Sequence, residues 1–245
     1  MLRKINDVSA LSLRALRAEA AALASPSKAM ILSGFFKTGP GQYGEGDVFI
    51  GLVVPQCRQL AKKYLSLGPA AASELLESPV HEERLTALLM LCELYRKGSP
   101  EEKKAIYDFY MAGVRWINNW DLVDLSAPKI VGPHLEKASR EPLFRLVHSA
   151  NLWERRMAVV ACFHFIRKSD FADFLKIAEV LLHDKHDLIH KAAGWMLREA
   201  GKRDKTVLEG FLSEHASVMP RTMLRYAIEK LPPKQRKAVL ESSRK

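Results

Sequence analysis

Apolar residues recur along the chain at helical spacing, and no convincing run alternates apolar and polar side chains as a half-buried strand would. β-Branched residues are also few. Four segments have the same pattern, in which basic or polar residues are followed by Ala, Leu, Val and Met. They are residues 83–94, 153–166, 189–199 and 220–230. Small residues occupy the positions at which a neighbouring helix would pack closely. The pattern predicts an all-α protein.

The spacing of these helices indicates a repeat. With one further helix added, the equivalent starts lie at Arg84, Asp121, Arg155, Lys191 and Arg221. Their intervals of 37, 34, 36 and 30 residues are typical of an α-solenoid built from helix pairs. The second helix of each pair is expected at residues 100–116, 136–147, 171–182 and 206–214. A solenoid of this size curves, so we expect a concave face that can serve as a groove.

One glycine-rich segment interrupts the helical pattern. Residues 34–51 hold six of the thirteen glycines and match neither a phosphate-binding P-loop nor a dinucleotide fingerprint, so a long connector is the simplest interpretation. We therefore expect a single domain over residues 1–245. Its parts are N-terminal helices (1–33), the Gly-rich loop (34–51), helical repeats (52–230) and a C-terminal helix or tail (231–245).

The formal net charge of +10 is concentrated in the second half of the chain. Residues 1–139 carry 17 basic and 15 acidic side chains, whereas residues 140–245 carry 21 and 13. A concentrated basic surface favours a polyanionic partner, with nucleic acid first and an anionic membrane second. A solvated surface that keeps the protein soluble would show the same charge.

The positions of the cysteines and the hydropathy of the chain argue against several further classes of protein. The three cysteines lie far apart with no C-x-x-C, which argues against a disulfide framework or a cysteine zinc site. The longest nearly apolar stretch, residues 157–166, is too short to span a bilayer. The N-terminal segment lacks the continuous apolar core of a signal peptide and predicts an amphipathic helix. We expect a cytoplasmic protein with no membrane association.

The segment R-W-I-N-N-W-D-L-V-D-L holds the most unusual side chains. On one continuous helix Trp116, Trp120 and Asp124 would share a face, since they recur every four residues. Two indoles and a carboxylate form a good wall for a cationic ligand. In the alternative interpretation both tryptophans pack inside and Asp124 caps a helix or pairs with a nearby arginine.

Other candidates have simpler structural explanations. Trp195 follows Gly194, which predicts close helix packing and burial. Trp153 precedes two arginines, an arrangement that suits a phosphate backbone and equally a solvated helix edge. Three histidines, at 183, 186 and 190, could hold a metal on one continuous helix, but polar turn residues are the simpler account. We expect no metal and no cofactor.

Several motifs in order resemble a known family. The segments FFKTGPGQYGEGDVFIGL, WDLVD, LWERRMA and HKAAGWMLRE look like those of the AlkD-type DNA glycosylases of the DNA alkylation repair family. The resemblance runs from about Phe35 to about Lys230. It implies a HEAT-like solenoid that hydrolyses the N-glycosidic bond of positively charged alkylated purines, such as 3-methyladenine and 7-methylguanine, in double-stranded DNA. We expect a monomer that needs no cofactor.

The resemblance also implies roles for particular residues. Asp124 corresponds to the catalytic carboxylate, and Trp120 and Trp195 to indoles that pack on the deoxyribose of the lesion. Arg156 corresponds to a phosphate-binding arginine. Phe35 matches an aromatic position that carries a tyrosine in some relatives, so a hydroxyl is missing here.

The basic residues of the last repeats, Arg155 and Lys191 among them, are expected to line the DNA groove. A non-catalytic HEAT-like scaffold that binds nucleic acid or an acidic protein is the alternative, since fold alone does not give function. The lone carboxylate of Asp124 favours the enzyme, because it would weaken phosphate affinity in a pure binding groove.

Overall fold

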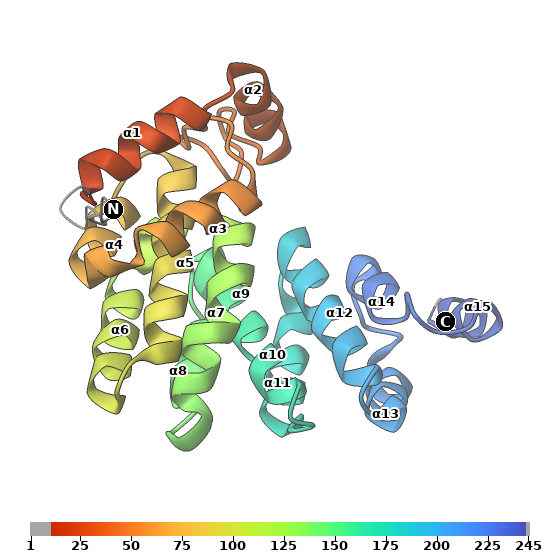
Figure 1. Cartoon of the computed structure of the whole chain (residues 1–245). Coiled ribbons are helices and arrows are strands. Elements are labelled where there is room, and N and C mark those ends of the chain that lie inside the picture. Colours follow the sequence, from red (N-terminus) through yellow and green to blue (C-terminus); the bar gives the residue numbers. More distant parts are fainter. Residues whose placement is uncertain (1–10, 244–245) are drawn as a thin grey trace, which may run out of the picture. The chain divides into compact units, whose positions relative to one another are not determined.

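The computed structural model describes residues 11–243, whose regular secondary structure is helical (Figure 1). An isolated bridge between Val48 and Val80 is the one strand-like pairing among these residues. The fold is an α-solenoid of helical repeats, which confirms the predicted fold class. No helix in the described part of the chain is long and apolar enough to cross a membrane.

The chain divides into two compact units, Met1–Leu122 and Val123–Lys245. We call them unit 1 and unit 2. Helix α7 (Trp120–His134) begins in unit 1 and continues into unit 2.

Unit 1 packs around one buried helix. Its helices are α1 (Leu13–Leu23), α2 (Pro26–Phe35), α3 (Val54–Lys63), α4 (Gly68–Leu76), α5 (His81–Lys97) and α6 (Pro100–Ala112). Helix α5 is buried over most of its length because α3 and α4 both pack against it. The hydroxyl of Ser99 accepts the backbone N–H of Glu102, whose carboxylate accepts the N–H of Ser99, and this reciprocal cap fixes the start of α6. Residues 1–10 of the predicted N-terminal helices lie outside the described residues.

Unit 2 is arranged around α12. After α7 it contains α8 (Glu141–Val147), α9 (Leu152–Ala161), α10 (Phe163–Ile166), α11 (Ala172–Val180), α12 (Asp187–Gly201), α13 (Lys205–His215), α14 (Arg221–Ala227) and α15 (Pro233–Ser242). Helix α12 packs against α9, α13 and α14. Gly194 allows α14 to approach closely, since a Cβ there would lie 2.4 Å from the Met223 carbonyl oxygen and 2.6 Å from the Tyr226 Cβ. The glycine therefore explains how α14 packs directly onto α12 beside Trp195.

The predicted repeat helices correspond to α5, α9 with α10, α12 and α14, and their partners to α6, α8, α11 and α13. One expectation is wrong. Trp116 does not share a helix with Trp120, because it ends a short 3-10 turn, Val114–Trp116, and α7 begins only at Trp120. The two asparagines between them break the helix, since the side-chain amides of Asn118 and Asn119 donate to the carboxylate of Asp47.

Candidate functional site

Unit 1 presents an aromatic cluster at the start of α7. Phe35, the last residue of α2, is 60% exposed, and its ring lies edge-on to Trp120 at a centroid distance of 5.8 Å. Buried Phe36 also stacks on Trp120, at a centroid distance of 5.1 Å and 21°, and on Phe49, at 5.1 Å and 14°. Trp120 is half-buried, so these contacts orient its indole and leave part of it accessible.

A buried ionic network lies behind these rings. The imidazole of His81, on the first turn of α5, bonds through Nδ1 to Asp47 at 3.0 Å and through Nε2 to Asp121 at 2.8 Å. Burial alone would lower the pKa of His81, but the hydrogen bonds to the two carboxylates outweigh it and raise that pKa to about 9. The ring is thus an imidazolium at neutral pH. It ties the Gly-rich segment, α5 and the first turn of α7 to one another.

Neighbouring side chains complete this network. Arg84 donates to Asp47 at 2.6 Å and to the carbonyl of Ser78 at 2.9 Å. The buried Glu82 carboxylate accepts the backbone N–H groups of Ile50, Gly51 and Leu52. A connector with many glycines is therefore held in one conformation by charge-assisted bonds from α5.

Unit 2 holds the predicted catalytic carboxylate in an ion pair. Arg156 Nε and Nη2 donate to Asp124 Oδ1 and Oδ2, each at 2.8 Å, and Nη1 donates to the carbonyl of Leu188 at 2.6 Å. The Arg156 side chain is 6% exposed and that of Asp124 is 18% exposed. The carboxylate is therefore the partner that meets solvent, and the guanidinium fixes the orientation of both its oxygens from the buried side.

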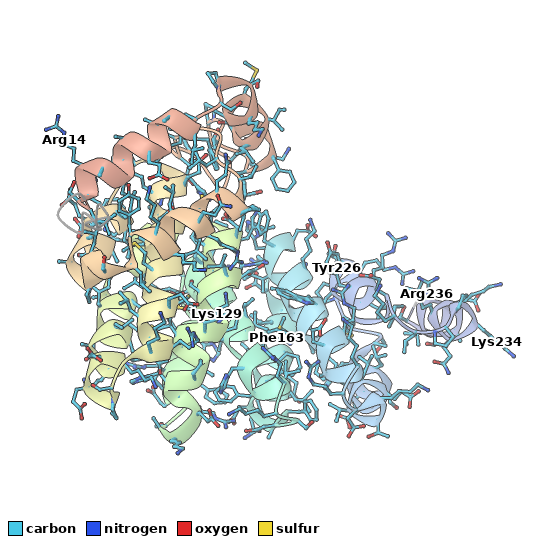
Figure 2. The ribbon with its side chains drawn as sticks, viewed as in Figure 1. Arg14, Lys129, Phe163, Tyr226, Lys234 and Arg236 are labelled. Atoms are coloured by element: carbon cyan, nitrogen blue, oxygen red, sulfur yellow. The ribbon has the colours of Figure 1, made fainter. Side chains whose placement is uncertain are left out.

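Asp124 lies at the edge of a cavity of about 510 Å³, all of whose lining residues belong to unit 2. Trp195 lines it and is half-buried, whereas the helix pattern alone predicted a core position; its ring lies 5.9 Å from Phe163. Lys129 and Arg167 also line the cavity, and Figure 2 shows Lys129 and Phe163. With Lys168, the cavity thus combines a carboxylate, an indole and three cations.

The other predicted DNA-binding residues are already paired. Arg155 donates to Asp184 at 2.7 Å and to the carbonyls of Ser149 and Ala150, and Lys191 lies 2.8 Å from Asp187. Their roles at DNA, like that of Arg156, stay predictions. Two of the three histidines bond to nearby backbone groups: His190 bonds to the carbonyl of Asp184, and His186 accepts the N–H of Leu188 at the start of α12.

Sequence reasoning missed the network of Asp47, His81 and Asp121. One signal was available: H-E-E-R places a histidine, two acids and an arginine in the first turn of a helix that is otherwise apolar. Lys129 and Arg167 were missed because nothing in the sequence separates them from other surface cations.

The helix pairs, the aromatic cluster of unit 1 and the arginine-bound carboxylate in the cavity of unit 2 define the chain as a helical-repeat protein. The family model described as "DNA alkylation repair enzyme" matches residues 16–231. Because this match covers most of the chain, the chain belongs to the DNA alkylation repair enzyme family, which confirms the predicted family.

A solved structure, described as a predicted DNA alkylation repair enzyme from Enterococcus faecalis, is similar to this chain with a TM-score of 0.66 and 20% sequence identity. The similarity covers 86% of this chain and 97% of that one, and it shows a shared fold. No curated protein matches the chain.

Proposed function

We propose that this protein is a DNA glycosylase that hydrolyses the N-glycosidic bond of positively charged alkylated purines, such as 3-methyladenine and 7-methylguanine, in duplex DNA. Its family supports DNA alkylation repair as the setting of the reaction. The observation that carries the proposal is the carboxylate of Asp124, which meets solvent at the cavity of Trp195 and is held in place by Arg156.

The chemistry needs one well-placed negative charge. Alkylation at N3 or N7 makes the purine cationic, so it leaves as a neutral base with the electrons of the glycosidic bond. The sugar develops oxocarbenium character as that bond breaks. The Asp124 carboxylate stabilises this charge, and its orientation is set before the reaction begins, so none of the stabilisation is spent on reorganisation.

Asp124 also binds and orients the attacking water. A carboxylate offers about four acceptor positions, and the hydrogen bonds from Arg156 take two of those of Asp124. A water bonded to this carboxylate attacks the anomeric carbon, forms the new C–O bond and releases its proton to the carboxylate or to solvent. Arg156 is then a positioning residue, whereas Asp124 contacts the reacting atoms.

The aromatic residues favour the cationic transition state. Indole faces attract cations, so the indole of Trp195, which lines the same cavity as Asp124, stabilises positive charge on a sugar packed against it. In unit 1, the partly exposed indole of Trp120 offers a second surface of this kind. Phe35 adds an apolar surface beside Trp120 without contributing a hydroxyl. Lys129 and Arg167 have no carboxylate partner among the described residues, and they supply positive charge for the phosphates that flank the lesion.

The decisive experiment compares Asp124→Asn with the unchanged protein on methylated duplex DNA, with the released bases quantified by chromatography. We expect release to fall by roughly a hundredfold or more, because the amide keeps the shape of the side chain and removes its charge. Binding to unmodified duplex should persist.

Asp173→Asn is the matched control. Asp173 is also a partly exposed carboxylate paired with an arginine of unit 2, at 3.0 Å from Arg140, which keeps Asp170 as a second partner. It lies outside the cavity, so release should be unchanged. A folded Asp124→Asn protein with undiminished release would contradict the assignment, and an unchanged protein that binds DNA but releases no base would favour a non-catalytic scaffold.

A further inference from the structure

Most basic side chains of unit 2 are neutralised locally by carboxylates. These pairs include Arg140 with Asp170 and Asp173, Arg155 with Asp184, Arg156 with Asp124, Lys191 with Asp187, Arg198 with Glu229, and Lys205 with Glu209. A cation with a carboxylate within hydrogen-bond distance contributes little to the attraction of a distant polyanion. The net positive charge of this half must therefore act through other residues.

The groove between α14 and α15 is an exception. It encloses about 610 Å³ and is lined by Arg221, Arg225 and Arg236, none of which has a carboxylate partner among residues 11–243. Arg221 donates to two neutral acceptors on the end of α15, the Ser243 hydroxyl at 3.1 Å and the Leu240 carbonyl at 3.5 Å, so its charge is retained. Three uncompensated guanidinium groups thus lie along one groove.

The acids of the groove do not cancel this charge. Glu229 is bonded to Arg198 and lies 3.2 Å from Lys230, while Glu241 lies 3.9 Å from Lys237. The hydrogen bond from Lys230 and the charge of Arg198 lower the pKa of Glu229, so it is ionised and committed to these partners. Each acid has a cation of its own, and the arginines remain in excess.

Helix α15 lies outside the residues that match the family model, which end at 231. Figure 2 shows Lys234 and Arg236 on α15 and Tyr226 on α14. Ile228 and Leu240 also line the groove, and apolar side chains beside the arginines lower the local dielectric and so strengthen electrostatic attraction to a bound anion.

We propose that the α14–α15 groove binds the phosphate backbone of duplex DNA away from the reacting nucleotide. Arginine suits this role because its planar guanidinium donates two parallel hydrogen bonds to a phosphate. Such binding is independent of sequence and lengthens the bound stretch of DNA. The identity of the polyanion rests on the proposed function, whereas the groove and its charges do not.

The test measures how binding to an unmodified duplex depends on salt, by fluorescence anisotropy between about 50 and 200 mM KCl. Arg225→Ala/Arg236→Ala should weaken binding about tenfold and reduce the slope of log K against log salt by about two, roughly 0.9 for each phosphate that is no longer neutralised. Arg225→Lys/Arg236→Lys should restore most of the slope. Arg221 is kept, because it bonds α14 to α15.

Lys176→Ala/Lys205→Ala is the control. It removes the same charge from exposed lysines of unit 2 that lie outside the groove and pair on their own helices, so the slope should not change. A double-alanine groove variant with the original slope would overturn the proposal, as would one that loses binding to anionic phospholipid vesicles and keeps DNA binding. Base release is measured separately on methylated DNA, so the absence of release would contradict the proposed function and leave the result on the groove intact.

Discussion

Arg156 donates three hydrogen bonds inside the protein, two to Asp124 and one to the carbonyl of Leu188. With 6% of its side chain exposed, it has little surface left for a phosphate. Its geometry instead matches that of a residue that orients a carboxylate. The difference matters because a positioning residue acts on the chemical step, whereas a phosphate anchor acts on binding.

Arg156→Lys separates the two roles. Lysine keeps the charge but cannot make the bidentate contact, so Asp124 loses its fixed orientation. We expect base release at saturating DNA to fall about ten- to a hundredfold, with little change in the affinity for unmodified duplex. Single-turnover release and anisotropy titration check this. Weaker binding with a salt slope smaller by about one would instead identify a phosphate contact.

Close packing of α12 against α14 places Trp195 and the α14–α15 groove on neighbouring elements of unit 2. The contact depends on Gly194, where a side chain would meet both the backbone and a side chain of α14. Sequence reasoning anticipated close packing at this position. The helix pattern also predicted burial of Trp195 next to it, whereas the family resemblance implied an accessible indole; the structure leaves it half-exposed, because burial of a tryptophan depends on which other helices cover it.

Gly194→Ala tests the contact between these helices. Overpacking typically costs about 1–3 kcal/mol, which exceeds the gain in helix propensity, so the free energy of unfolding should fall. Gly210→Ala, on α13, is the control because a Cβ there meets nothing within 4 Å. It should stabilise the protein by up to about 1 kcal/mol. Urea unfolding measures both, and a Gly194→Ala protein as stable as the control would show that α14 can move aside.

The stability of the whole molecule should depend on pH through His81. Both its ring nitrogens face carboxylates, Asp47 and Asp121, and Arg84 is the nearby like charge. Since the folded-state pKa is raised from 6.5 to about 9, the stabilisation is fully present below about pH 6.5 and is lost as the pH rises through 9.

We expect the free energy of unfolding in urea to fall by roughly 3 kcal/mol between neutral pH and pH values above 9. His81→Gln should be less stable at neutral pH and should lose most of this dependence. If the variant and the unchanged protein lost the same amount over this interval, the imidazolium would not be the source.

The sequence by itself determined the helical class, the period of the repeat, the family and the candidate residues around Trp120, Asp124 and Trp195. Local periodicity and motif order carry that information, because a helix face is set by residues three and four apart. Only the tertiary structure decided which charges are paired. Asp124 pairs with Arg156, thirty-two residues away, and Asp47 of the Gly-rich segment pairs with His81 and Arg84 of α5.

Because pairing is decided by the tertiary structure, the sequence also could not show which basic residues are available to bind DNA. Arg155, Lys191 and Arg225 look alike in the sequence, yet the first two are neutralised by carboxylates and the third is not. The electrostatic energy of two charges depends on the distance between them in space. The net charge of +8 that the sequence gives for residues 140–245 therefore cannot show which of the basic side chains are unpaired.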